Sequence, residues 1–128
     1  MTTSSLLLSF TILFSLITKH FICDFLLQDE KQLSEKGNML KSGGYIHAGI
    51  HASMTFVVLF SLFREFYMMA LCAATIDFVL HYLIDWSKVQ ISQKYSVTPK
   101  DKLFWYLFGL DQYLHLMTYF GLAAIFAF

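Results

Sequence analysis

Long apolar runs alternate with short polar stretches along the whole chain. Four runs hold about 20 residues or more, over residues 6–27, 45–63, 66–89 and 102–128. A helix of that length rises about 30 Å, the thickness of the hydrocarbon core of a bilayer. A segment surrounded by lipid must satisfy its own backbone hydrogen bonds, so spans of this kind are helical. The pattern therefore predicts an all-α protein, a four-helix transmembrane bundle.

Polar connections separate the predicted helices, at 29–44, 63–66 and 90–101. The first closes with Gly43 and Gly44, which we interpret as a helix breaker. The third ends in a Thr-Pro-Lys-Asp sequence, which predicts a helix N-terminus capped by Thr98. The connections thus divide the chain into two helical hairpins.

Composition favours a membrane protein over a soluble one. Of the 128 residues, 57% are apolar and 14% are charged, whereas a soluble domain carries about a quarter charged residues. The length allows one domain, over residues 1–128. A soluble bundle with an oily core is the alternative fold, and it is disfavoured because the runs are apolar on every face. The formal net charge of zero gives no indication of a nucleic-acid partner.

The lysines predict how the protein lies in the membrane. Seven of them lie in or beside the first and third connections, against Arg64 alone in the second. By the positive-inside rule those two connections face the cytoplasm, and both termini face outward. The expected partner is the lipid bilayer, and the oligomeric state stays open.

Ionisable and amide side chains recur inside the predicted spans at intervals of four residues. Residues four apart share one face of a helix. At 1.5 Å per residue, all four groups lie roughly 21–24 Å from the outer face. We therefore expect them to meet, towards the cytoplasmic side. The groups are His20, Asp24 and Gln28; His47 and His51; Asp77, His81 and Asp85; and Asp111 and His115.

The same spacing indicates an internal repeat. Two series of four polar residues have the same intervals between their members. Each series is followed along the chain by a polar connection and then by a pair of ionisable residues four positions apart. This predicts that the two hairpins are pseudo-symmetric about an axis along the membrane normal. The series are His20, Asp24, Gln28 and Lys31, and Asp77, His81, Asp85 and Lys88.

This density of imidazoles and carboxylates predicts a metal centre. Two divalent ions would balance four aspartate charges where isolated charge is expensive, and a dinuclear site suits a four-helix bundle. Mixed nitrogen and oxygen ligands suit zinc, manganese or iron(II). The expected ligands are His20, Asp24, His47, His51, Asp77, His81, Asp111 and His115, with Gln28 and Gln112 as their hydrogen-bonding partners.

Such a centre predicts a membrane-embedded, metal-dependent hydrolase acting on an amphipathic, lipid-like substrate such as a phosphoester. Asp85 is the candidate catalytic base, because it lies one turn beyond His81 on the cytoplasmic side. Lys31 and Lys88 are expected either to bind lipid phosphates or to serve as solvated topology signals. A metal-ion or proton transporter or sensor is the alternative function, and a purely structural polar network is a third interpretation.

These motifs together resemble a bacterial and phage membrane family catalogued as domain of unknown function 3307, over about residues 18–117. The resemblance implies a small multi-pass protein of the bacterial inner membrane and supplies no established activity. More loosely, the His/Asp spacing is similar to that of predicted membrane-bound metal-dependent hydrolases. The family motifs are His20, Asp24, Phe25, Gln28 and Lys31; His47 and His51; His81, Ile84, Asp85 and Lys88; and Asp111, Gln112 and His115.

Overall fold

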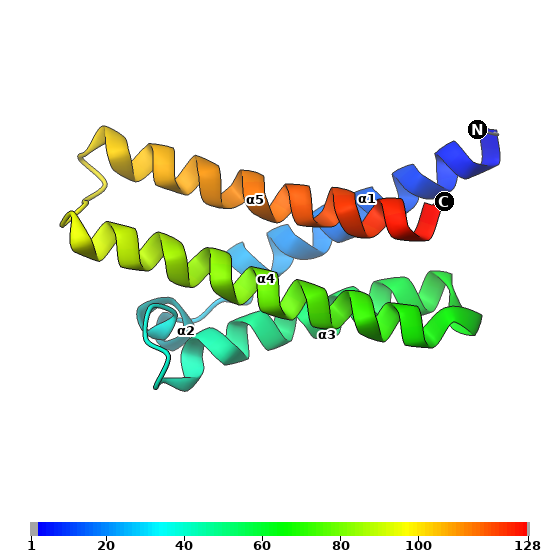
Figure 1. Cartoon of the computed structure of the whole chain (residues 1–128), viewed down its shortest axis with the longest axis horizontal. Coiled ribbons are helices and arrows are strands. Elements are labelled where there is room, and N and C mark those ends of the chain that lie inside the picture. Colours follow the sequence, from blue (N-terminus) through cyan, green and yellow to red (C-terminus); the bar gives the residue numbers. More distant parts are fainter. Residues whose placement is uncertain (1–2, 128) are drawn as a thin grey trace.

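The computed structural model describes residues 3–127, and no residue in that range lies in a strand. The prediction of an all-α protein is therefore confirmed. Four long helices run along the longest axis of the molecule (Figure 1). They are α1 (Thr3–Phe25), α3 (Ser42–Leu62), α4 (Tyr67–Lys94) and α5 (Lys102–Ala127), with the short α2 (Glu30–Glu35) and a 3-10 turn, η1 (Arg64–Phe66), in the connections.

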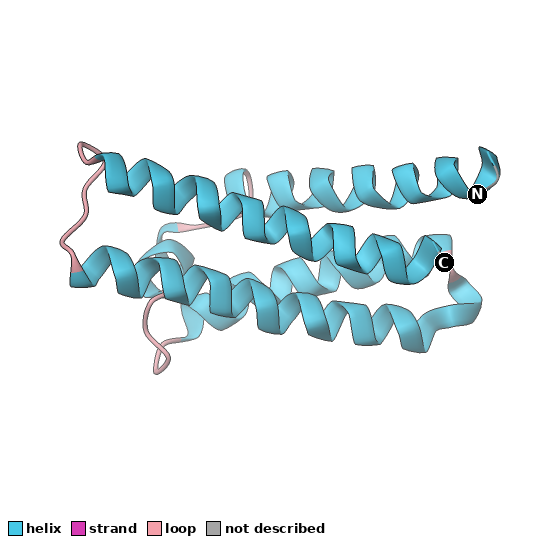
Figure 2. Cartoon of the chain, turned by 45° about the horizontal axis from the view of Figure 1, so that its top comes forward, coloured by secondary structure: helices cyan, strands magenta, loops and turns pink. Residues whose placement is uncertain are grey.

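The long helices form a closed ring in which each contacts two others. The neighbouring pairs are α1 with α3, α3 with α4, α4 with α5, and α5 with α1, while α2 packs on α3. The first and third connections lie at one end of the molecule, and η1 and both ends of the described chain lie at the other (Figure 2). This arrangement places the lysine-rich connections on the same side.

Among the described residues, three helical segments are long and apolar enough to cross a membrane: Ser5–Phe25, Ser42–Leu62 and Arg64–Lys94. Helix α5, which carries Asp111, Gln112 and His115, is not among these segments. The structure therefore bears out a helical protein with three candidate spans, and five α-helices rather than four.

The helix ends differ from the predicted ones for local reasons. Helix α1 stops at Phe25, because the N–H groups of Leu26 and Leu27 both bond to the Ile22 carbonyl and the chain turns. Helix α4 continues five residues past the predicted end and stops just before Ser96, whose φ of 49° is incompatible with a helix.

The first connection holds a helix that the pattern did not predict. Asp29 caps α2 by accepting a hydrogen bond from the Gln32 N–H at 2.7 Å. The prediction that Gly43 and Gly44 break a helix is wrong, because both lie in the first turn of α3. A Cβ on Gly43 would lie 2.6 Å from the Lys31 carbonyl oxygen. These glycines instead allow the α2 segment to pack closely against α3.

The start of α5 lies one turn later than its predicted cap. Residues 98–101 form a turn in which the Asp101 carboxylate accepts hydrogen bonds from the N–H and the hydroxyl of Thr98, both at 2.8 Å. These bonds hold the pKa of the exposed Asp101 below its usual value. Thr98 therefore does not cap the helix, which begins at Lys102.

An apolar core fills the half of the bundle near the chain termini. Ile12, Leu16, Leu59 and Tyr119 are completely buried there, with Leu122 almost so. The interior of the other half, near the lysine-rich connections, is polar. The fold thus places a polar site between a closed apolar core and the two connections.

Candidate metal centre

The polar groups of the four long helices meet in the interior, as their common depth predicts. His47, His51, His81 and His115 are each 1% exposed or less. Three groups of side chains bring potential ligand atoms within 4.8 Å of one another. The groups are Asp24, His47, His51 and His81; His20, His81 and His115; and Asp85, Asp111 and His115.

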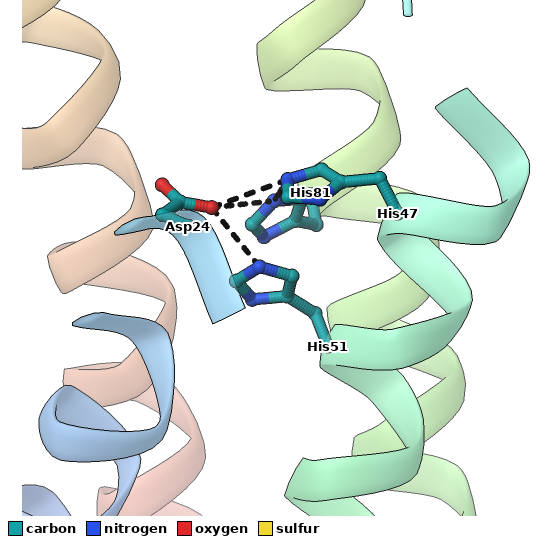
Figure 3. A group of neighbouring side chains, drawn as sticks. All are labelled: Asp24, His47, His51 and His81. Carbon is teal, nitrogen blue, oxygen red and sulfur yellow. Dashed lines mark hydrogen bonds and ion pairs between the residues drawn. The ribbon is translucent and has the colours of Figure 1, made fainter. Parts of the chain in front are cut away.

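The first group has the spacing of a metal site. The Asp24 Oδ1 atom lies 3.1 Å from His47 Nε2 and 3.0 Å from His51 Nε2. The Nε2 atom of His81 lies 3.9 Å from the same oxygen and 3.1 Å from His47 Nε2. Figure 3 shows the three imidazoles, from α3 and α4, turned towards Asp24 on α1. Tetrahedral zinc ligands about 2.0–2.1 Å from the ion lie about 3.3 Å apart, so these separations fit one ion.

Buried atoms without hydrogen-bond partners support the same position. Asp24 Oδ1 and His51 Nε2 are both buried and have no hydrogen bond of acceptable geometry. Leaving a buried polar atom unsatisfied costs about 1–3 kcal/mol. A cation among these atoms would satisfy both, so the first group fits a divalent ion with three nitrogen ligands and one oxygen ligand.

Amide side chains fix the orientation of His47. Its Nδ1 atom lies 3.3 Å from the Gln32 Oε1 acceptor, and the tautomer that donates to this oxygen leaves Nε2 free to bind metal. The amide nitrogen of Gln28, one of the two predicted partners, lies 3.2 Å from both ring nitrogens of His47. Gln32 was not predicted, although it extends the four-residue series of Asp24 and Gln28 by one step.

Other partners hold the second oxygen of Asp24. His20 Nε2 lies 3.3 Å from Asp24 Oδ2, and the His20 Nδ1 atom is 3.0 Å from the Tyr119 hydroxyl. Gln112 donates to the same carboxylate oxygen at 3.4 Å and to Asp111 at 3.2 Å. His20 and Gln112 therefore orient the Asp24 carboxylate towards the first group.

Three lysines neutralise the other aspartates of the cluster, and the sequence argument for two ions did not include them. Lys19 and Lys36 are buried, at 2% and 5% exposure. Asp24 is the one cluster aspartate that lacks a lysine within ion-pair distance in the described structure. The pairs are Lys19 with Asp77 at 2.7 Å, Lys36 with Asp85 at 3.2 Å and Lys88 with Asp111 at 2.8 Å.

Asp77 lies apart from the other expected ligands. It belongs to none of the three groups. Its Oδ2 atom accepts hydrogen bonds from Lys19 and, at 2.6 Å, from the Thr55 hydroxyl. Lys19 also donates to the backbone carbonyl of His51 at 3.2 Å, so this pair supports the segment of α3 that carries a potential ligand. Lys19 lies inside the first predicted span, and a lysine at such a position could have indicated a buried ion pair.

The two lysines expected to bind substrate lie in different places. Lys88 points into the cluster, whereas Lys31 is on the exposed side of α2. Lys36, five residues later, occupies the buried position in the first connection. The repeat therefore does not extend to the lysines, because the first connection contains α2 and the third does not.

A cavity connects this cluster with the surface at the end of the bundle that holds the connections. Its volume is about 500 Å³, and it lies between α1, α4 and α5 beneath the first connection. Its lining includes the polar side chains of Asp24, Lys36 and Lys88 and the apolar side chains of Phe104 and Phe108. Asp24 is thus shared by the first ligand group and the cavity wall.

Fold and site together define an all-helical protein with three candidate membrane spans and a buried His/Asp cluster that could hold a metal ion. The chain belongs to the family described as "Protein of unknown function (DUF3307)", which it matches over residues 12–127. The family resemblance drawn from the motifs is confirmed. The searches of curated proteins and of solved structures gave no match, and the looser likeness to membrane-bound hydrolases finds no support in the comparisons.

Proposed function

We propose that this protein is a membrane-embedded, metal-dependent hydrolase acting on an amphipathic, lipid-like substrate. One divalent ion, zinc in preference to manganese or iron(II), is held by Asp24, His47, His51 and His81. The observation that carries the proposal is that Asp24 belongs both to this group and to the wall of the cavity. A substrate in the cavity would therefore lie beside a residue that holds the ion.

Charge favours one ion over two. With neutral histidines, the four cluster aspartates and the three buried or half-buried lysines leave a single negative charge. One divalent ion changes this to a single positive charge, and a second ion would raise it to three in a low-dielectric interior. Asp85, Asp111 and His115 would be the ligands of a second ion, but Lys36 and Lys88 already compensate these carboxylates.

The residues around the first group provide the parts of a hydrolytic site. A divalent ion supplies Lewis-acid activation of water and of a carbonyl or phosphoryl oxygen. Asp85 Oδ2 lies 3.4 Å from His47 Nε2 and 3.6 Å from His81 Nε2. The Asp85 carboxylate therefore borders the first group without belonging to it, where it would accept a proton from a neighbouring water molecule. Lys36 donates to both of its oxygens at 3.2 Å and holds it in place.

The closed side of the cluster favours hydrolysis over transport. Between the cluster and the chain termini the interior is filled by Ile12, Leu16, Leu59 and Leu122. No series of polar side chains crosses this core in the described chain, so one copy offers ions no route to the far face. Transport or sensing of metal ions or protons is therefore the weaker candidate.

The proposal includes a position in the membrane. Helix α5 has 26 residues and packs between α1 and α4, so it would span the bilayer with them although it is not one of the three candidate spans. The lysine-rich connections face the cytoplasm of a bacterial cell, with both termini outward. The cavity then opens at the cytoplasmic side of the inner membrane.

Substitution of the candidate base tests the proposed reaction. In Asp85→Asn we expect the ion to remain bound and hydrolysis of a lipid phosphoester to fall by about 100-fold or more, since asparagine accepts no proton. Asp101→Asn, at a fully exposed carboxylate in the third connection, is the control and should keep full activity. Loss of the ion in Asp85→Asn would make Asp85 a ligand. Ion flux through proteoliposomes, without hydrolysis by metal-loaded protein, would favour the transporter.

A further inference from the structure

We infer that the cavity beside Asp24 binds an anionic amphiphile, with its negatively charged headgroup at Lys36 and Lys88 and its alkyl chain against Phe104 and Phe108. The inference rests on the proposed function and names the substrate class of that same site. It follows from the charge of the metal-loaded cluster, the donors that remain free on Lys88 and the apolar wall.

The first argument is the charge that one ion leaves behind. With a divalent ion in the first group, the set of four aspartates and three lysines, all buried or half-buried, carries one positive charge. An uncompensated charge is unfavourable in a site surrounded by hydrocarbon. The polar side of the cavity adjoins this set through Asp24, Lys36 and Lys88, so a ligand with one negative charge would neutralise it. A neutral ligand would not.

The second argument is that lysine donors remain available. An ammonium group has three N–H donors. Lys88 Nζ donates to Asp111 at 2.8 Å, while its distance of 4.0 Å to Asp85 is too long for a hydrogen bond. Lys88 is also 22% exposed. Two donors of Lys88 can therefore reach an anion in the cavity without disrupting its ion pair.

The third argument is the shape and chemistry of the remaining wall. Its apolar side is formed by Leu33 of α2, Val89 of α4 and Phe104, Leu107 and Phe108 of α5. The volume of about 500 Å³ lies within the range of about 300–1,000 Å³ that is typical of small-ligand pockets. A free inorganic anion would leave this apolar surface uncovered, whereas an alkyl chain would bury it.

The first connection covers part of the cavity and turns Lys36 inward. A Cβ on Gly37 would collide with the Val89 side chain, so a glycine is required where the connection crosses α4. Gln90 donates to the Gly37 carbonyl at 2.7 Å and fixes this crossing. The Lys36 ammonium is thereby placed beneath the backbone, against Asp85.

Binding of defined probes tests the inference. Zinc-loaded protein in uncharged maltoside micelles is titrated with dodecyl phosphate, dodecanol and inorganic phosphate, and the dissociation constants and zinc content are measured separately. We expect dodecyl phosphate to bind at least tenfold more tightly than either other probe. Lys88→Gln and Leu107→Trp should each weaken its binding at least tenfold while zinc is retained, and Lys88→Arg should restore it.

Matched controls make a negative result interpretable. Lys41→Gln removes an exposed lysine of the first connection, and Leu110→Trp enlarges an outward-facing side chain of α5, so neither should change binding. With normal zinc content, the inference would be overturned if dodecanol or inorganic phosphate bound as tightly as dodecyl phosphate. It would also be overturned if Lys88→Gln did not weaken the binding of dodecyl phosphate. Absence of zinc would instead refute the proposed function.

Discussion

Asp24, which is half-buried, differs from the three buried aspartates of the cluster in the kind of partner it has. Asp77, Asp85 and Asp111 each face a lysine, whereas Asp24 faces imidazole nitrogens. A lysine ammonium satisfies a carboxylate by itself, but a neutral imidazole donates at most one hydrogen. Several imidazoles directed at one oxygen leave lone pairs facing one another, and a cation relieves that arrangement.

Asp77 provides a residue-level test of this distinction. The double variant Lys19→Met/Asp77→Asn removes both charges of the ion pair together. The introduced amide still accepts a hydrogen bond from Thr55, so we expect zinc to be retained. In Lys19→Met alone the buried carboxylate loses its counter-charge, and stability should fall by about 3–5 kcal/mol. Unfolding titrations and zinc analysis of both variants measure this. Loss of zinc from the folded double variant would make Asp77 a ligand.

The sequence predicted the histidines, the aspartates and Lys88 of the site, but not Lys19 or Lys36. The four-residue spacing fixes which side chains share a helical face, and backbone geometry then brings the faces together, as for Asp24 and His81. A lysine has a long, flexible stem, so its charged group is placed by packing far from its own backbone. Lys36 lies in a connection and reaches Asp85 only because α2 folds back on α3. The periodicity of the sequence does not predict this packing.

At the scale of the elements, the first connection is part of the site. Helix α2 supplies Gln32 to His47, and the residue after it supplies Lys36 to Asp85. Glycines at 37, 43 and 44 allow this segment to pack closely. The apolar pattern predicted the long helices because length and hydropathy define them, whereas a six-residue helix without an apolar face gave no such signal.

Gly37→Val tests whether this packing holds the site together. Because the added side chain would collide with Val89, we expect the connection to move outward, with a loss of about 1–3 kcal/mol of stability. Lys36, which is buried in the wild-type protein, should then react readily with an amine-acylating reagent. Mass spectrometry measures this modification. Gly109→Ala is the control, since nothing lies within 4 Å of the added Cβ. Unchanged protection of Lys36 in Gly37→Val would show that the connection does not depend on close contact.

At the scale of the whole molecule, the two halves of the bundle differ in what fills their interior. Fully buried apolar side chains close the half near the termini, and the cluster with its cavity occupies the other half. Under the proposed function, this asymmetry makes the orientation in the membrane decisive for where substrate would enter.

Cysteine labelling tests that orientation. Single cysteines at Ser34 and Lys100, both exposed in the lysine-rich connections, should be protected from membrane-impermeant maleimide in intact cells. A cysteine at Glu65, exposed at the opposite end, should react. Permeabilised cells, in which every site should react, are the control. The reverse pattern would place the cavity on the outer side.

The number of metal ions per chain tests the central claim most directly. Elemental mass spectrometry of protein purified without chelator and reconstituted with zinc should give one zinc per chain. His51→Ala should abolish this zinc, because it removes a ligand of the first group, whereas His115→Ala should retain it. No zinc in the wild-type protein, two per chain, or full occupancy in folded His51→Ala would contradict a single ion held by Asp24, His47, His51 and His81.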